Sequence, residues 1–215
     1  MKICIINGSP KTGKSISELL IGYLMQFIKG NEVVTYNICK TGFSKIQFSQ
    51  IQNSDVLIFA FPLYIDSINS CLLRFLAWLE KRGFENNNIV VYCIINNGFY
   101  EGYQNHVAVS IMKNWCKAAG LVYGQTLGIG AGEMLPFFED VPLGHGPNKN
   151  IGTAIQELSR NILSLDQGKD LFISPNLPRF LWKTASSFCF WYPQAKKNGL
   201  KRKRLKEKAN YISKK

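Results

Sequence analysis

The sequence predicts an α/β fold: a doubly wound sheet of five parallel strands with helices on both faces, followed by a C-terminal aromatic and basic extension. Two observations carry this prediction. Short apolar runs rich in β-branched residues, typical of strands buried on both faces, alternate with longer segments in which apolar residues recur every three or four positions. Strands that alternate with helices along a chain favour a parallel sheet with helical crossovers.

A strand, a glycine loop and a helix open the chain. Lys2–Asn7 is a β-branched run that ends at Gly8. The apolar period becomes helical from Ser15, and Ser15 and Glu18 have the spacing of a capping box. The same alternation predicts strands at 32–37, 55–61, 89–96 and 121–127 and helices at 68–79, 103–119 and 151–165. The segment 128–150, rich in Gly and Pro, is predicted to be a functional or mobile loop.

The 215 residues divide into a predicted domain at 1–166 and an extension at 167–215. A polar break at 166–170 opens the extension, which contains an aromatic segment at 180–193 and a basic tail at 196–215. The tail holds ten Lys or Arg residues and one Glu, a net charge of +9, so the other residues carry only +3 of the total of +12. The basic character therefore belongs to the tail and not to the fold.

The cysteines and the N-terminus predict a reduced, cytoplasmic protein. No C-x-x-C pair is present and most cysteines fall in apolar stretches, which is typical of reduced core thiols; they are Cys4, Cys39, Cys71, Cys93, Cys116 and Cys189. The chain begins directly with a strand, without the features of a signal peptide. The longest apolar run, 89–95, is far shorter than the roughly 20 residues that cross a bilayer. The two histidines lack metal-ligand spacing, so we expect no metal site.

The glycine loop at 8–15 matches the P-loop pattern G-x-x-x-x-G-K-[ST] letter for letter. A nucleoside triphosphatase also needs a second acid near the end of a strand to hold magnesium. Asp55 instead begins its strand, and the strand at 89–96 is followed by amide side chains. The same loop at a helix N-terminus suits a single phosphate group without magnesium, because free N–H groups and the helix dipole both favour an anion. Simple helix capping is the structural alternative for Ser9 and Ser15.

Three motifs follow three predicted strands: Asn7-Gly8-Ser9-Pro10 with Ser15, Phe61-Pro62-Leu63-Tyr64, and Asn96-Asn97-Gly98-Phe99. In these motifs, over roughly residues 1–165, the chain resembles the flavodoxin-like family of NAD(P)H-dependent FMN reductases and quinone reductases. Their order also fits the rule that ligands bind at the carboxyl ends of strands near a switch point of the sheet. The chain departs from the family at Thr12-Gly13-Lys14, where a longer, asparagine-rich loop is common.

The resemblance implies an FMN cofactor that carries the chemistry, so no catalytic side chain is expected. The implied contacts are Ser9, Lys11, Thr12, Gly13 and Ser15 at the phosphate, and Pro62, Leu63, Tyr64, Ile65, Asn96, Asn97, Gly98 and Phe99 at the isoalloxazine ring. Core packing is the alternative for Tyr64 and Phe99, and a plain turn is the alternative for Asn97-Gly98.

The implied activity is hydride transfer from NADH or NADPH to FMN, followed by electron transfer to a quinone, a nitro compound, a metal or a second flavin. The resemblance also implies a homodimer. Two alternatives stay open, a flavodoxin-type electron carrier without NAD(P)H activity and a P-loop NTPase. Such carriers are typically strongly acidic, whereas residues 1–195 of this chain are nearly neutral, with a net charge of +3. This balance favours the enzyme. Glu133 and His145 in the 128–150 segment are candidates for contact with the substrate.

The extension allows three interpretations. Its aromatic residues could pack against the domain or a second subunit, which is the favoured interpretation. Aromatic residues before a basic run also suit an anionic membrane surface. Binding of nucleic acid through its phosphates is the least favoured of the three.

Overall fold

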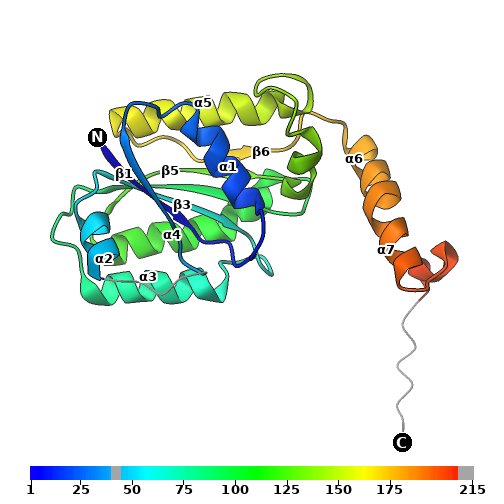
Figure 1. Cartoon of the computed structure of the whole chain (residues 1–215), viewed down its shortest axis with the longest axis horizontal. Helices are drawn as coiled ribbons and strands as arrows, with labels where there is room; N and C mark the ends of the chain where they lie inside the picture. The colour runs from blue at the N-terminus through cyan, green and yellow to red at the C-terminus, as the bar shows by residue number, and fades with distance from the viewer. Residues whose placement is uncertain (40–44, 208–215) are drawn as a thin grey trace, which may run out of the picture. The chain divides into compact units, whose positions relative to one another are not determined.

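A computed structural model describes residues 1–39 and 45–207, which belong to two compact units, Met1–Asn176 and Leu177–Lys215. The first unit is an α/β domain whose sheet lies between two layers of helices (Figure 1). Residues 40–44 and the part of the predicted basic tail at 208–215 lie outside the described residues.

The sheet is parallel, with the strand order β2-β1-β3-β4-β5-β6. Its strands are β1 (Lys2–Asn7), β2 (Glu32–Asn37), β3 (Val56–Pro62), β4 (Val90–Asn96), β5 (Val122–Ile129) and β6 (Leu171–Ile173). The first five have the 2-1-3-4-5 order of doubly wound flavodoxin-like sheets, in which connections leave in opposite directions from the point between β1 and β3. Asn7 pairs with Ala60 and Pro62 with Asn96, so the carboxyl ends of β1, β3 and β4 share one edge.

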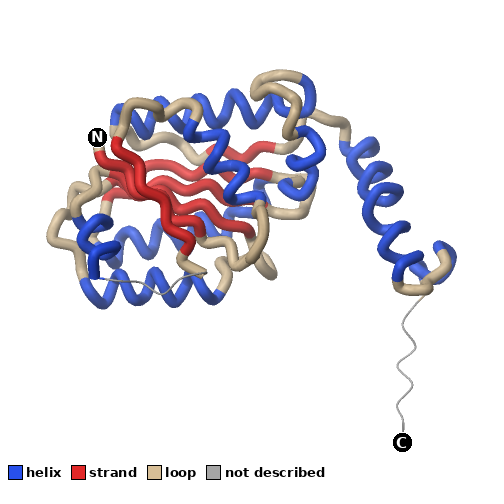
Figure 2. The backbone as a smooth tube through the Cα atoms, in the orientation of Figure 1, coloured by secondary structure: helices blue, strands red, loops and turns tan. Residues whose placement is uncertain are grey.

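Helices cover both faces of the sheet (Figure 2). The helices of the first unit are α1 (Ile16–Met25), α2 (Lys45–Gln52), α3 (Ser70–Arg82), α4 (His106–Ala119) and α5 (Lys149–Ser164). One core lies under α1 and α5 and receives Ile3 and Ile5 from β1, whereas the other lies under α3 and α4 and receives Cys4 and Ile6. This alternation follows from the pleat of a strand that is buried on both faces.

The sixth strand corrects the five-stranded prediction. β6 pairs with β5, so the sheet continues beyond the predicted domain end at 166. The polar break that precedes β6 is bonded to the sheet: the Asp170 carboxylate accepts from the Tyr123 hydroxyl at 2.6 Å and from the Thr126 N–H at 3.0 Å, and it pairs with Lys113 at 2.6 Å. A stretch that resembles a linker in sequence is therefore held by tertiary contacts.

The cysteines correct the prediction of six reduced thiols. Cys39 and Cys71 form a disulfide with a Cα–Cα distance of 5.9 Å, and Cys189 is exposed. The other three thiols are buried, as predicted. Burial raises the pKa of Cys4 and of Cys116 to about 12, which keeps both protonated at neutral pH.

The described part of the second unit is helical. Its elements are α6 (Arg179–Ala185), the π-helical segment η4 (Ser186–Trp191), α7 (Tyr192–Lys197) and the 3-10 helix η5 (Arg202–Lys206). Of the helices in the described part of the chain, none is both long enough and apolar enough to span a bilayer.

Candidate functional site

Three loops meet at the carboxyl edge of the sheet. The Gly8 N–H donates to the carbonyl of Ala60 at 2.9 Å, which joins the β1 loop to β3. The Leu63 N–H donates to the carbonyl of Asn96 at 2.8 Å, which joins the β3 loop to β4. The three motifs predicted from the sequence therefore lie side by side at the point where the strand connections diverge.

The β1 loop places hydroxyl groups at the N-terminus of α1. Ser15 is the N-cap of α1, and its Oγ accepts from the Glu18 N–H at 3.1 Å, which confirms the predicted cap. This bond uses the Ser15 oxygen as an acceptor and leaves the hydroxyl proton free to donate to an anion. Ser9 and Ser15 are buried, whereas the predicted contacts Lys11, Thr12 and Gly13 form an exposed rim.

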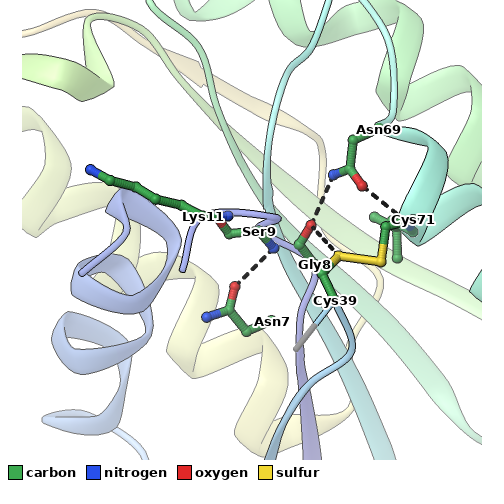
Figure 3. The surroundings of a disulfide bond; sticks show 8 residues. Asn7, Gly8, Ser9, Lys11, Cys39, Asn69 and Cys71 are labelled. Carbon is green, nitrogen blue, oxygen red and sulfur yellow. Dashed lines mark hydrogen bonds between the residues drawn. A yellow bond between two sulfur atoms is a disulfide. The ribbon is translucent and has the colours of Figure 1, made fainter. Parts of the chain in front are cut away.

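Hydrogen bonds from the Asn7 and Asn69 side chains hold the β1 loop in place (Figure 3). Asn7 Oδ1 accepts from the Ser9 N–H at 3.0 Å, which folds the loop back over the end of β1. The Asn69 side chain donates to the Gly8 carbonyl at 2.8 Å. Asn69 also caps α3, so one amide side chain ties the loop to the start of that helix. These bonds give the loop a fixed shape before any ligand arrives.

The disulfide lies at the same place. Cys39 follows β2, Cys71 lies in the first turn of α3, and the Cys39 sulfur is 3.7 Å from the Gly8 carbonyl oxygen. In Figure 3 the Lys11 side chain extends away from the disulfide. Sequence reasoning missed both Asn69 and the disulfide. The cap position before 70–82 is a signal that could have found Asn69, but two cysteines 32 residues apart give none.

The β3 loop contains a strained turn. Tyr64 and Ser67 exchange backbone hydrogen bonds of 2.9 and 3.0 Å, and the two residues between them have φ values of 48° (Ile65) and 56° (Asp66). Two left-handed residues in a row define a type I′ turn, which normally takes Asn or Gly. A β-branched residue is disfavoured there, and such strain is found at functional sites. The Ile65 side chain is 98% exposed and Tyr64 is exposed beside it, so the loop presents an apolar ledge.

The β4 loop contains a buried acceptor that lacks a donor. The Asn96 side chain is buried and accepts from the Ser17 hydroxyl of α1 at 3.4 Å. Asn97 Nδ2 donates to the Glu101 carbonyl at 3.2 Å, but Asn97 Oδ1 has no hydrogen-bond partner among the residues that the structure describes. An unpaired buried acceptor costs on the order of 1–3 kcal/mol unless a ligand or water satisfies it. Phe99 is half exposed, so core packing does not account for its ring.

The first residues after β5 close over the β4 loop. The Gly132 N–H donates to the Asn97 carbonyl at 2.8 Å. A Cβ at Gly132 would stand 3.0 Å from Asn96 Nδ2, so a larger residue would push against this amide. Glu133 lies beside Gly98, where an added Cβ would stand 3.8 Å from the Glu133 carboxylate. The structure therefore brings Glu133 to the site, whereas His145 is exposed and its Nδ1 lies 3.3 Å from the Leu143 carbonyl.

A groove of about 520 Å³ runs along α1 next to the β1 loop. Lys11, Lys14 and Glu18 line it together with Tyr23 and Glu139. Burial and the Glu139 carboxylate raise the Tyr23 pKa. Across residues 1–39 and 45–207, no three His, Cys, Asp or Glu side chains are grouped in a way that could hold a metal ion.

The strand order and the three loops at its switch point define a flavodoxin-like fold, as the sequence predicts. No protein-family model matches the chain, and no curated protein matches its sequence.

Solved structures match the fold. An FMN-dependent NADH-azoreductase from Bacillus anthracis in complex with FMN has a TM-score of 0.55 and 12% identity, with 75% of this chain and 99% of that chain covered. An apo NADH:FMN oxidoreductase has a TM-score of 0.55 and 14% identity over 74% and 89%. A short-chain flavodoxin associated with a bacterial microcompartment has a TM-score of 0.52 and 11% identity over 77% and 98%. At these identities the likeness shows the flavodoxin-like fold, which an azoreductase, an oxidoreductase and a flavodoxin share.

Proposed function

We propose that the protein is an FMN-dependent oxidoreductase that takes electrons from NADH or NADPH and passes them to a small-molecule acceptor such as a quinone, a nitro compound, a flavin or a metal ion. The observation that carries the proposal is the meeting of three loops at the switch point. They offer a hydroxyl-lined helix N-terminus, an exposed apolar ledge and an unpaired buried acceptor. FMN has a phosphate, a flat aromatic ring and a ring edge with an N–H donor, one for each feature.

The phosphate would bind at the β1 loop. Ser9 and Ser15 supply hydroxyls, and the exposed backbone at Thr12 and Gly13 lies where the α1 dipole favours negative charge. Lys11 adds a positive charge at the rim. The bonds from Asn7 and Asn69 hold this loop in place, so little ordering is needed when the phosphate binds.

The ring would lie between the β3 and β4 loops. On the β3 side its contacts would be Pro62, Leu63, Tyr64 and Ile65, and on the β4 side Asn96, Asn97, Gly98 and Phe99. The exposed apolar side chains of Tyr64, Ile65 and Phe99 would cover its faces, and Asn97 Oδ1 would accept from its N–H edge. The unpaired acceptor is the residue-level reason to place the polar edge of the ring here.

Bound FMN supplies the chemistry, because it accepts a hydride and releases electrons singly or in pairs. The chain would bind and orient it, and the apolar side chains of the ledge would exclude water from the ring face. Glu133 lies next to Gly98 and is the nearest candidate for contact with a substrate. No proton-transferring pair of side chains is required by this proposal.

The purified protein tests the proposal. We expect yellow protein, or apoprotein that binds added FMN with a loss of free-flavin fluorescence. Under anaerobic conditions NADH or NADPH should then bleach the flavin absorbance, and a quinone should restore it. If FMN binds but neither nicotinamide bleaches it, the electron carrier is the remaining function. If the protein is colourless, does not bind FMN and hydrolyses ATP, the P-loop NTPase is the remaining function.

The carrier is the second candidate because a short-chain flavodoxin shares the fold. The charge of the body argues against it: residues 1–176 contain 14 basic and 13 acidic residues, a net charge of +1. A carrier that docks through an acidic surface would have a negative net charge instead.

We also propose a homodimer in the cytoplasm, where NADH and NADPH are available. Light scattering of the purified protein tests the dimer, and cell fractionation tests the location.

A further inference from the structure

The second unit exposes large apolar side chains that the first unit's chemistry does not use. Four aromatic side chains between 180 and 191 are exposed to solvent, and two leucines further along are exposed as well: Phe180, Phe188, Phe190, Trp191, Leu200 and Leu205. Phe190 and Trp191 contact each other edge to face at 5.3 Å, and exposed apolar surface of this kind marks contact with a partner or a membrane.

The same unit carries nearly all of the net charge. Residues 177–215 contain 12 basic residues and one acid, Glu207, a net charge of +11 out of the total of +12. No Asp or Glu occurs from 171 to 206, and Glu207 is paired with Arg204 at 3.2 Å. The charge of this surface therefore complements an anionic partner.

The end of α7 turns the basic segment back. Gly199 has a φ of 71°, and the Leu200 N–H donates to the Ala195 carbonyl at 2.8 Å. This is the Schellman motif, which ends a helix with a left-handed glycine and reverses the chain. Asn198-Gly199 therefore ends α7 and reverses the direction of the chain before η5.

The reversed segment places cations next to aromatic rings. The Arg202 guanidinium lies 3.7 Å from the centre of the Tyr192 ring and 4.8 Å from that of Phe188. The two rings also contact each other edge to face at 5.2 Å. A cationic group and aromatic rings are therefore adjacent at this point of the unit.

We propose that the second unit, Leu177–Lys215, binds the surface of an anionic phospholipid bilayer. Aromatic rings prefer the boundary between headgroups and acyl chains, and Lys and Arg side chains beside them reach the lipid phosphates. The helix would lie on the surface, in agreement with its lack of a spanning stretch. A second copy is a poorer partner, because it offers the same positive unit and a first unit with a net charge of only +1.

Membrane binding would place the proposed oxidoreductase beside acceptors that dissolve in lipid, such as apolar quinones. That consequence rests on the proposed function. Vesicle binding itself does not, because it needs neither flavin nor nicotinamide, so the two proposals fail independently.

Co-sedimentation of the full-length protein with lipid vesicles tests the proposal. We expect binding to vesicles that contain phosphatidylglycerol and none to vesicles of phosphatidylcholine alone, with a loss of binding as salt screens the charges. Lys203→Gln should weaken binding about fivefold, the effect of one basic side chain near an anionic surface. Its matched control, Lys117→Gln in the first unit, should bind like the parent chain.

A second pair of variants tests the apolar contact. Trp191→Ser should weaken binding to anionic vesicles by about tenfold or more, since it removes a large exposed ring, whereas Phe137→Ser, which removes an exposed ring from the first unit, should not. Equal binding to neutral vesicles, or no binding to either kind, would overturn the proposal. If the parent chain does not bind vesicles and Trp191→Ser dissociates a dimer, the surface belongs to a second copy. If the parent chain binds RNA or DNA in a salt-sensitive way and does not bind vesicles, the surface belongs to nucleic acid. Unchanged circular-dichroism spectra and melting temperatures in all four variants check that they fold.

Discussion

Replacing Ile65 by Asn tests the strained turn and the proposed flavin site in one variant. Ile65 has a left-handed backbone with a φ of 48° and a side chain that is 98% exposed. The left-handed region costs a non-glycine residue roughly 1–2 kcal/mol, and Asn reduces this cost by local hydrogen bonding. Loss of the side chain removes little buried surface. We therefore expect Ile65→Asn to raise the free energy of unfolding of the apoprotein by about 1 kcal/mol.

The measurements are a thermal melt and a flavin titration. A gain of about 1 kcal/mol corresponds to roughly 2–4 °C in the melting temperature of a unit of this size. FMN affinity should move the opposite way, by about tenfold, because an apolar contact with the ring worth about 1.4 kcal/mol is lost. A variant that is more stable and binds FMN less well is the expected result.

Asp66→Asn is the matched control. Asp66 occupies the same turn with a φ of 56° and lies outside the predicted ring contacts, and Asp and Asn both tolerate this backbone. Neither melting temperature nor FMN affinity should change appreciably. If Ile65→Asn left the melting temperature unchanged or lowered it, the backbone would not be strained. Unchanged FMN affinity would remove Ile65 from the ring site.

Three further predictions concern the β1 loop and the cysteines. Ser15→Ala should cost about 1 kcal/mol of stability as a lost helix cap, and it should weaken FMN binding more than binding of riboflavin, which lacks the phosphate; equal losses in the two titrations would contradict a phosphate site. Gly8→Ala should destabilise the protein by about 1–3 kcal/mol in urea unfolding, because an added Cβ would stand 3.1 Å from its nearest neighbour, whereas Gly13→Ala, which meets nothing within 4 Å, should spare stability and lower FMN affinity. Alkylation of the native protein should label only Cys189 without reductant and the two disulfide cysteines as well after reduction, as read by peptide mass spectrometry; labelling of three cysteines without reductant would refute the disulfide.

The central part of the fold was predictable because its strands are buried on both faces. β1 and β2 have the predicted bounds, and β3 and β4 begin one residue later than predicted, since apolar β-branched runs leave little alternative. β6 was not predictable. It has only three residues, and what identifies it as part of the sheet is the set of tertiary bonds made by Asp170 and by Gln125, whose side chain donates to the Lys169 carbonyl at 2.6 Å.

The candidate site was predictable as a location, because the ends of parallel strands share one edge of the sheet. Its details were not. The turn at Ile65 and Asp66 contains no glycine or asparagine, the residues that predict a left-handed backbone. The unpaired Asn97 oxygen depends on which neighbours reach it, and the disulfide depends on a β2 loop and α3 meeting behind Gly8. Each of these features is set by packing between segments that are distant in sequence.

The sixth strand also decides where the chain can be cut. β6 covers the backbone groups of β5 from Leu127 to Ile129, which would otherwise form an open sheet edge. A chain shortened at residue 166 would lose that cover and expose unpaired N–H and C=O groups beside the β5 loop, a template for aggregation through strand pairing. A chain shortened after Asn176 keeps β6 paired with β5, so we expect the boundary of the stable unit to follow β6 and not the end of α5.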